Sequence, residues 1–299
     1  MNRIPHFFIA TPIFNEGSDG VKMLHFLCHS LNKIGVHSSI VFMDPRDPSN
    51  NSFITAIGDQ GINKDLITPV VKFINEIDLE NDVIIYPEIV QGNPLKGKNI
   101  ARYFLNKNAF ITGDPISIGE NDFILTYQKI FNLVSHFNLY YPMQDIGQIP
   151  SREALEKSER PFSLTYIGKG LKYGNCARIS NTIGLDWKKS KEEYFLLLEH
   201  SQFLFTWDPM TGVVFDAIIR GCIPIYLLYK PWTEKEVFSQ ELLFPRMTAI
   251  DFDNKTEYFS DYKFFLDERE RMITQVINFQ NNWDTQVECF VEKVIKHFY

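Results

Sequence analysis

The chain of 299 residues has no apolar run near the ~18 residues that a membrane-spanning helix needs. Its N-terminal apolar run, residues 7–10, is too short for a secretory signal and fits a first buried strand. Basic residues are also few, with 30 Lys and Arg against 37 Asp and Glu, which disfavours a general nucleic-acid binder. The four cysteines (Cys28, Cys176, Cys222 and Cys289) lack metal or disulfide spacing. We therefore expect a cytoplasmic protein with free thiols and no nucleic-acid partner.

Large apolar side chains, in contrast, are abundant. The chain has 26 Phe and 13 Tyr within a hydrophobic content of 44%, so it can build large cores. Because 299 residues exceed the usual size of a single domain, two domains of about 150 residues each are expected.

The first half alternates short apolar segments with amphipathic ones. Residues 6–12, 38–43 and 82–86 are expected strands, and residues 21–34, ended by Gly35, are an expected helix. A second helix is expected over residues 97–105. Alternation of this kind predicts a parallel sheet covered by helices.

The pattern restarts after the charged stretch at 151–161. Strands are expected at 163–167, 203–207 and 223–228, helices at 191–199 and 212–220, and helical periodicity over 267–299. We predict an α/β fold with two Rossmann-like domains, residues 1–155 and 156–299, and a C-terminal helical segment.

The most informative stretch is residues 207–224, WDPMTGVVFDAIIRGCIP. It places Asp208 at a strand end, Thr211 and Gly212 at the next turn, and Asp216 one to two turns into a helix. Ligands of open α/β sheets bind beyond the carboxyl ends of strands, and a helix N-terminus offers free N–H groups to phosphate. Asp216 could then accept hydrogen bonds from ribose hydroxyls. The alternative is that Asp208 and Thr211 only cap the helix and Asp216 lies on a solvated face.

This stretch resembles the donor-binding region of GT-B glycosyltransferases, in which two acidic residues with seven residues between them precede a small residue, a glycine and a proline. Asp208 and Asp216 take the acidic positions, followed by Ala217, Gly221 and Pro224. It departs from the pattern because both acids are Asp rather than the commoner Glu and because Gly212 comes one place late. The resemblance implies two Rossmann-like domains facing each other across a cleft, with a nucleotide-sugar donor held by the second.

Residues 163–173, SLTYIGKGLKY, are similar to the first strand and glycine turn of the same family's C-terminal domain. A basic residue beside that turn contacts the donor diphosphate in the family. Lys169 and Lys172 are the matching residues, with Arg178 in reserve. Gly168 and Gly170 would let the backbone approach the phosphates closely.

Residues 82–102 resemble a stretch of bacterial GT-B enzymes that build surface polysaccharides such as O-antigen and capsule. There a strand ends in Pro-Glu and Gly-Asn-Pro follows, which implies that Glu88 and Asn93 lie at the cleft. A plain turn at Asn93 is the alternative.

The loop after the first strand also faces the cleft in this family, which implies that Asn15 and Gly17 lie on the acceptor side. An inverting transfer needs a general base for the acceptor hydroxyl, and Glu16, Asp19 and Glu88 are the candidates. A retaining transfer needs no such base, so these acids could instead orient sugar hydroxyls.

Two further signals concern the membrane and metals. Lys96, Lys98, Arg102 and Lys107 lie near Tyr103 and Phe104, which is typical either of a peripheral membrane patch or of a solvated helix face. No Asp-x-Asp pair lies where a metal-dependent transferase would hold its cation, so no metal and no cofactor are expected.

Three functions remain open. The first is metal-independent transfer of a sugar from a nucleotide-sugar to a saccharide or lipid-linked saccharide in bacterial surface polysaccharide synthesis. The second is epimerisation of a nucleotide-sugar by a GT-B-like fold, and the third is a non-catalytic binding subunit of a polysaccharide assembly complex.

Overall fold

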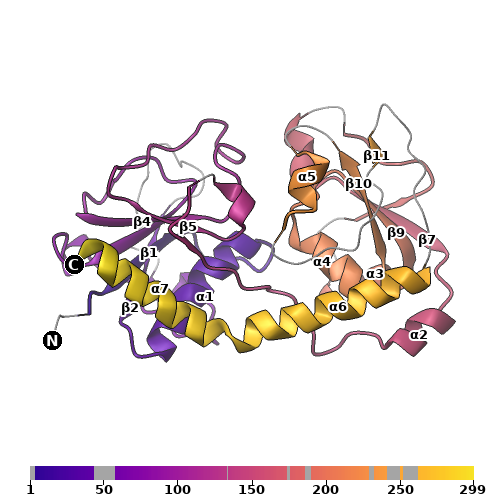
Figure 1. Cartoon of the computed structure of the whole chain (residues 1–299), viewed down its shortest axis with the longest axis horizontal. Coiled ribbons are helices and arrows are strands. Elements are labelled where there is room, and N and C mark those ends of the chain that lie inside the picture. The colour runs from indigo at the N-terminus through magenta and orange to yellow at the C-terminus, as the bar shows by residue number, and fades with distance from the viewer. Residues whose placement is uncertain are drawn as a thin grey trace. The chain divides into compact units, whose positions relative to one another are not determined.

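The computed structural model describes residues 4–43, 58–132, 134–173, 176–185, 190–228, 232–240, 250–251 and 262–299. The chain forms two compact units (Figure 1). Unit 1 comprises Met1–Tyr141 and Phe279–Tyr299, and unit 2 comprises Pro142–Asn278. Each unit contains one parallel sheet, so the predicted α/β fold with two such sheets and C-terminal helices is confirmed.

Unit 1 is built on a six-stranded sheet in the order β2-β1-β3-β4-β5-β6. Its strands are β1 (Phe7–Thr11), β2 (Ser38–Phe42), β3 (Val83–Pro87), β4 (Asn99–Phe104), β5 (Phe123–Thr126) and β6 (Phe137–Asn138). Helix α1 (Asp19–Lys33) joins β1 to β2, and the short 3-10 helices η1 (Gly58–Gly61), η2 (Ile74–Glu76) and η3 (Lys129–Phe131) lie in later connections.

The two faces of this sheet are covered differently. On one face α7 (Trp283–Phe298) lies beside α1 (Figure 1), and Trp283 Nε1 donates to Ser30 Oγ of α1 at 2.7 Å. The Phe290 ring lies 5.8 Å from the Phe7 ring of β1. On the other face, Phe8 and Ile84 pack with Val71, Ile77, Val90 and Leu95 from connecting segments. Loops therefore form the cover that helices form on the first face.

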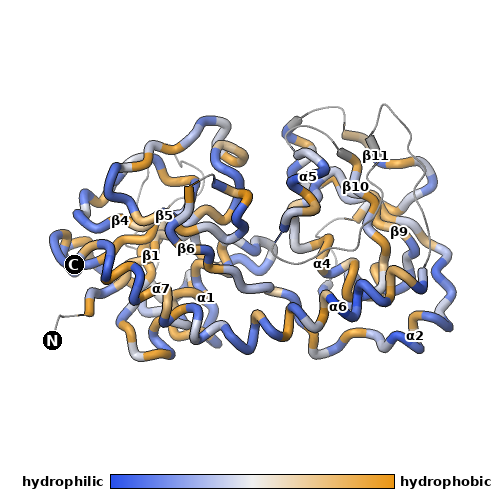
Figure 2. The backbone as a smooth tube through the Cα atoms, in the orientation of Figure 1, coloured by the Kyte–Doolittle hydropathy of each residue, from blue (hydrophilic) through white to orange (hydrophobic). Residues whose placement is uncertain are grey.

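Unit 2 has a five-stranded sheet in the order β11-β10-β9-β7-β8. Its strands are β7 (Phe162–Tyr166), β8 (Ile183–Gly184), β9 (Ser201–Thr206), β10 (Ile223–Leu228) and β11 (Ile250–Asp251). Its helices are α2 (Arg152–Lys157), η4 (Gly168–Tyr173), α3 (Lys191–Glu199), α4 (Gly212–Ile219), α5 (Glu234–Val237) and α6 (Tyr262–Asn281), the last of which runs beyond the end of the unit. In Figure 2, which colours the backbone by residue hydropathy, β9 and β10 are mainly apolar segments.

Two arginines fix the carboxyl end of α4. Arg269 of α6, only 1% exposed, donates from Nε to the carbonyl of Ile219 at 2.8 Å. Arg160 donates to the carbonyls of Arg220, at 3.0 Å, and Gly221. Cations at a helix C-terminus complement its dipole, so these contacts hold α4 in place and thereby position its N-terminus.

Both sheets follow the same plan. Counted within each unit, the first strand lies between the second and the third: β1 between β2 and β3, and β7 between β8 and β9. In open sheets of this order, ligands bind beyond the carboxyl ends of the strands at the reversal point, here β1/β3 and β7/β9. We call these two places the switch points.

Two sequence expectations differ from the structure. The helix predicted over residues 97–105 is wrong: this segment contains strand β4 (Asn99–Phe104), and all residues of the strand are buried. A central parallel strand is covered on both faces and so lacks the alternation that marks a half-exposed strand. The units also part after Tyr141 rather than at residues 155–156, and the terminal segment is divided between them because α7 packs its apolar side on unit 1.

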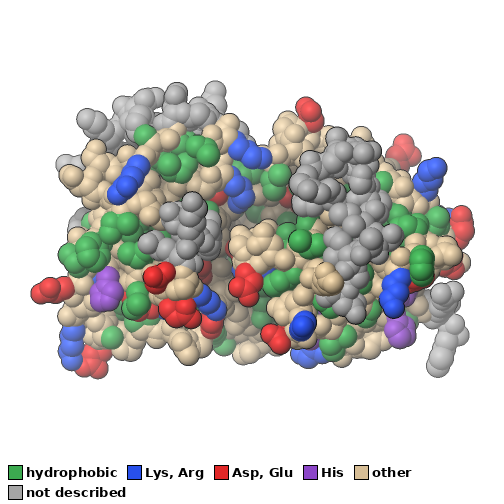
Figure 3. Space-filling view, turned by 180° about the vertical axis from the view of Figure 1, so that it is seen from behind, with side chains coloured by type: hydrophobic (Ala, Val, Ile, Leu, Met, Phe, Trp, Pro, Cys, Tyr) green, Lys and Arg blue, Asp and Glu red, His purple; other side chains and the backbone are tan. Residues whose placement is uncertain are grey.

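None of the helices formed by the described residues is long and apolar enough to cross a membrane. On the face drawn in Figure 3, acidic and basic side chains lie interspersed among apolar ones.

Candidate functional site

Asp208 lies at the switch point of unit 2, two residues beyond β9. Its side chain is 1% exposed, and Oδ2 accepts the backbone N–H of Lys169 at 3.1 Å. The Lys169 ammonium Nζ lies 3.6 Å from the same oxygen and remains partly exposed. The carboxylate therefore joins the end of β9 to the loop after β7, across the reversal of strand order.

The two side-chain oxygens of Asp208 have different surroundings. Oδ1 is buried and has no hydrogen-bond partner among the described residues. A buried carboxylate oxygen without a donor is costly, so a hydroxyl or water that donates to it would remove the penalty. Within unit 2, Asp208 is thus a group that gains free energy from a bound hydrogen-bond donor.

The two glycines of the turn are required by packing. Gly168 has a φ of +50°, and a Cβ there would lie 2.6 Å from Asp208 Oδ2. A Cβ on Gly170 would lie 2.7 Å from Cβ of Trp207. Small residues here let η4 lie directly against the segment that carries Asp208. Their predicted contact with donor phosphates stays a prediction.

The N-terminus of α4 lies next along the chain. Thr211 is its N-cap, with φ −134° and ψ 151°, but its side chain makes no capping hydrogen bond, and Gly212 is the first helical residue. The first N–H groups of α4 are therefore without a side-chain cap. Such a terminus, with its dipole, attracts phosphate oxygens.

Asp216 faces helix α3. Its Oδ2 accepts a hydrogen bond from the Tyr194 hydroxyl at 3.0 Å, and the side chain is half-buried. A purely solvated face is thereby excluded for Asp216. The two remaining basic candidates are exposed: Lys172 lies in the last turn of η4, and Arg178 donates to the carbonyl of Thr182.

In unit 1 the loop after β1 is a compact turn. Asn15 Oδ1 accepts the N–H of Gly17 at 2.8 Å, and Ser18 caps α1 through Val21 N–H. Asp19 begins α1 and pairs with Lys22, whose Nζ lies 2.6 Å away. Asn15 and Gly17 thus shape the turn, and Asp19 is engaged along its own helix.

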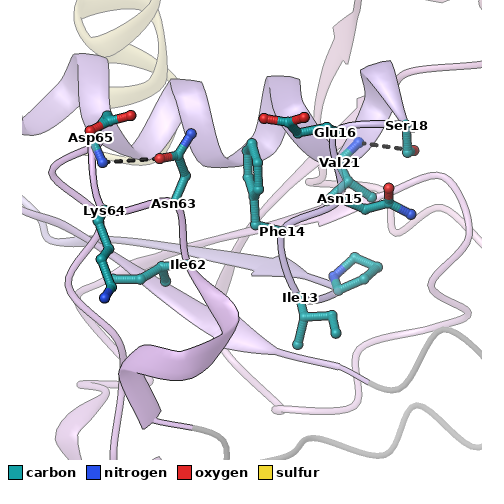
Figure 4. A pocket seen from close by; sticks show the side chains of 11 residues that line it. Ile13, Phe14, Asn15, Glu16, Ser18, Val21, Ile62, Asn63, Lys64 and Asp65 are labelled. Atoms are coloured by element: carbon teal, nitrogen blue, oxygen red, sulfur yellow. Dashed lines mark hydrogen bonds between the residues drawn. The ribbon is translucent and has the colours of Figure 1, made fainter. Parts of the chain in front are cut away.

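This loop forms one wall of a cavity of about 900 Å³ (Figure 4). The opposite wall is residues 62–65, which the sequence did not single out. The lining residues are Pro12, Ile13, Phe14, Asn15, Glu16, Ser18, Val21, Ile62, Asn63, Lys64 and Asp65. Of the three candidate bases, Glu16 is the one that lines this cavity, and its side chain is exposed.

Glu88 and Asn93 both form hydrogen bonds with backbone groups. Glu88 is 4% exposed, and its Oε2 accepts the N–H of Leu105 at 3.0 Å. Asn93 accepts from the Tyr86 hydroxyl at 3.2 Å and donates to the Gly97 carbonyl at 2.7 Å, so it fastens a turn. The turn interpretation of Asn93 accounts for these contacts, and its acceptor-side role stays a prediction.

The predicted basic-aromatic patch loses three members, because Arg102, Tyr103 and Phe104 are all buried. Arg102 is 2% exposed and donates from Nε to Asp122 Oδ2 at 2.8 Å and from a terminal nitrogen to the Val90 carbonyl at 3.1 Å. It is an interior residue of β4. Lys98 is exposed and lies 3.5 Å from a carboxylate oxygen of Glu80.

His25 is a further residue that sequence reasoning left unassigned. It is fully buried under the loop after β1, and Nε2 lies 3.0 Å from the Pro12 carbonyl. Because a carbonyl only accepts, Nε2 carries the proton, and Nδ1 is a buried atom with no hydrogen-bond partner among the residues that the structure describes. Burial lowers the pKa of His25, so the neutral ring supports the cavity wall.

Among residues that the structure describes, no group of three or more His, Cys, Asp and Glu side chains is arranged to hold a metal ion.

No protein-family model matches the chain, and no curated protein matches it. Solved structures do show similarity over nearly the whole length. One is an alpha-glucosyltransferase in complex with UDP and a 13-mer DNA containing a HMU base, at 12% identity and TM-score 0.42, with 98% of this chain and 95% of that one covered.

A second is T4 phage BGT in complex with UDP and Mn²⁺, at 9% identity and TM-score 0.45, covering 97% of this chain and 99% of that one. A third is the spinosyn rhamnosyltransferase SpnG, at 9% identity and TM-score 0.38, covering 97% and 96%. At these values the likeness assigns no activity to the chain.

Proposed function

We propose that this chain is a glycosyltransferase that moves a sugar from a nucleotide-sugar donor to a saccharide acceptor. The observation that carries the proposal is the switch point of unit 2. There the buried Asp208, with one unpartnered oxygen, lies beside Lys169. The uncapped N-terminus of α4 follows a few residues along the chain. A donor with hydroxyl groups and a diphosphate offers a partner to each of these groups.

In the proposed reaction, groups of unit 2 stabilise the leaving group and a side chain of unit 1 accepts the proton. The bond between the anomeric carbon and the diphosphate oxygen breaks, and its electron pair leaves with the nucleoside diphosphate. Lys169, Lys172 and the N–H groups near Thr211 and Gly212 stabilise that negative charge. The acceptor oxygen bonds to the anomeric carbon, and its proton passes to a base in an inverting transfer, a role that we assign to Glu16 because it lines the cavity of unit 1.

The resemblance of residues 82–102 supports a finer statement of the acceptor. The acceptor is a saccharide or lipid-linked saccharide of a bacterial surface polysaccharide such as O-antigen or capsule. Donor binding needs no metal ion and survives a chelator. The protein works in the cytoplasm, with peripheral contact to the inner face of the membrane through Lys96, Lys98 and Lys107, which co-sedimentation with anionic vesicles would detect.

The Lys169→Ala variant tests donor binding. Thermal shift and calorimetry with a panel of nucleoside diphosphates and nucleotide-sugars, in EDTA, should show stabilisation of the wild type by one nucleotide family. Loss of a charged hydrogen-bonding partner should weaken that binding about 10- to 100-fold. Lys22→Ala is the matched control, since Lys22 is also paired with an aspartate but lies in unit 1. Equal affinity in wild type and Lys169→Ala would remove Lys169 from the donor site.

Turnover separates the three functions. Release of nucleoside diphosphate only in the presence of an acceptor indicates sugar transfer. Conversion of the donor without a second substrate indicates epimerisation, and nucleotide binding without any conversion indicates a binding subunit.

A further inference from the structure

We propose that the cavity of unit 1 between residues 12–18 and 62–65 binds a neutral saccharide, with Asp65 and Glu16 selecting it through its hydroxyl groups. This inference rests on the proposed function and names the class of acceptor. It assigns a binding role to residues 62–65, for which the sequence offered no signal.

Hydrogen bonds hold the walls of the cavity in place. Phe14 N–H donates to the Gly61 carbonyl at 2.7 Å, which ties the loop after β1 to the end of η1, immediately before residues 62–65. Asn63 Oδ1 accepts the Asp65 N–H at 3.0 Å, so residues 63–65 form a fixed turn. His25 holds the Pro12 carbonyl from beneath. A volume of about 900 Å³ lies within the range of small-molecule sites.

The lining suits a sugar ring. Ile13, Phe14, Val21 and Ile62 supply apolar surface against which the C–H faces of a pyranose can pack. In the view of Figure 4 the Phe14 side chain lies between Glu16 and Asn63. The cavity therefore presents apolar surface and hydrogen-bonding groups side by side. This suits a sugar ring, which has apolar C–H faces and polar hydroxyl groups.

The charges favour a neutral ligand. Glu16 and Asp65 place two carboxylates at the rim against one ammonium group, that of Lys64. Neither carboxylate has a hydrogen bond or ion pair with any described residue, and both side chains are exposed. Ionised carboxylates only accept hydrogen bonds, so they suit hydroxyl donors and repel a uronate or phosphate.

The test uses a glycan array that carries neutral oligosaccharides and matched glycans containing uronic or sialic acid. The full-length wild type should bind neutral members. Asp65→Asn keeps the shape but removes the charge, and it should weaken that binding about tenfold, the equivalent of one charge-assisted hydrogen bond. Asp114→Asn, which alters an exposed acid of unit 1 outside the cavity, should leave binding unchanged.

A charge reversal sharpens the result. Asp65→Lys should shift binding from neutral glycans toward the acidic ones, because the rim then carries a net positive charge. Binding of acidic glycans by the wild type, absence of any neutral binder, or unchanged binding in Asp65→Asn would each overturn the inference.

Nucleotide binding, measured by thermal shift on the same samples, distinguishes the two proposals. If nucleotides bind but neutral glycans do not, the cavity inference alone fails. If neutral glycans bind through Asp65 but no nucleotide binds, the proposed transferase fails and the saccharide site stands.

Discussion

The switch points of the two units share a strand order but differ in where their buried acid points. In unit 1 Glu88 follows the third strand, β3, and accepts the N–H of Leu105, just beyond the neighbouring β4. In unit 2 Asp208 follows the third strand, β9, and accepts the N–H of Lys169, in the loop after the first strand, β7. One acid turns away from the reversal point and the other bridges it.

This difference gives the two places different chemistry. In unit 2 the bridge closes the loop after β7 onto β9 and brings Lys169 to the carboxylate. In unit 1 the loop after β1 is not held by Glu88, and it lines an open cavity with Glu16 at its rim. The same backbone plan thus offers cations and helix N–H groups in one unit and free carboxylates in the other, which suits a donor diphosphate and a neutral sugar respectively.

The largest effect is expected for Gly168→Ala, which disturbs the hydrogen bond from the Lys169 N–H to Asp208 in unit 2. A left-handed φ costs a non-glycine residue about 1 to 2 kcal/mol, and forcing in an extra methyl group costs about 1 to 3 kcal/mol more. The added Cβ would lie 2.6 Å from Asp208 Oδ2. Denaturant titration should show a loss of unfolding free energy on the order of 3 kcal/mol, together with weaker nucleotide binding.

Gly35→Ala in unit 1 is the matched control, because Gly35 has a φ of +83° and nothing lies within 4 Å of the added Cβ. Its free energy of unfolding should fall only by the cost of the left-handed backbone, and its nucleotide binding should be unchanged. Equal losses of stability in the two variants would mean that the contact of Gly168 with Asp208 contributes nothing.

An intermediate effect is expected from acid on unit 1. Burial lowers the pKa of His25 below its ordinary 6.5, so the unfolded chain binds more protons once the pH falls below that value. Stability is then lost toward lower pH, by at most about 1.4 kcal/mol per pH unit for one group, until the folded-state pKa is passed.

Hydrogen exchange at pH 7.5 and 5.5 should therefore show greater loss of protection in α1 than in α4. His25→Gln preserves a donor for the Pro12 carbonyl but does not titrate, so it should reduce the pH dependence in α1. His29 and His136, whose pKa values burial also lowers, should contribute to the pH dependence that remains. An unchanged pH dependence in His25→Gln would assign the acid sensitivity to other groups.

The smallest effect is expected for Tyr194→Phe, which removes the hydrogen bond to Asp216. Loss of one such bond costs about 0.5 to 1.5 kcal/mol of stability. If Asp216 contacts the ribose, its freed carboxylate should also weaken nucleotide affinity a few-fold. Tyr103→Phe in unit 1 removes the hydroxyl that donates to the Leu139 carbonyl, and it should lower stability without changing nucleotide affinity. Equal nucleotide affinity in both variants would separate Asp216 from the donor.

Several elements could be predicted from local pattern. The strand expected at residues 223–228 is β10, and the helix expected at 191–199 is α3, with the same bounds. Helix α1 begins two residues before its prediction, because Ser18 caps it. Strand β4 was missed because both of its faces are buried, and β5 and β6 are short strands for which no pattern was recognised.

The sequence by itself determined which chemical groups stand at strand ends and helix starts, because these depend on the spacing of neighbouring residues. Asp208, Thr211 and Gly212 were placed in this way. Only the tertiary structure decided which groups meet: Asp208 with Lys169, 39 residues away, Asp216 with Tyr194, and residues 12–18 with 62–65. These contacts depend on strand order, and strand order is set by packing between segments that are distant in the chain.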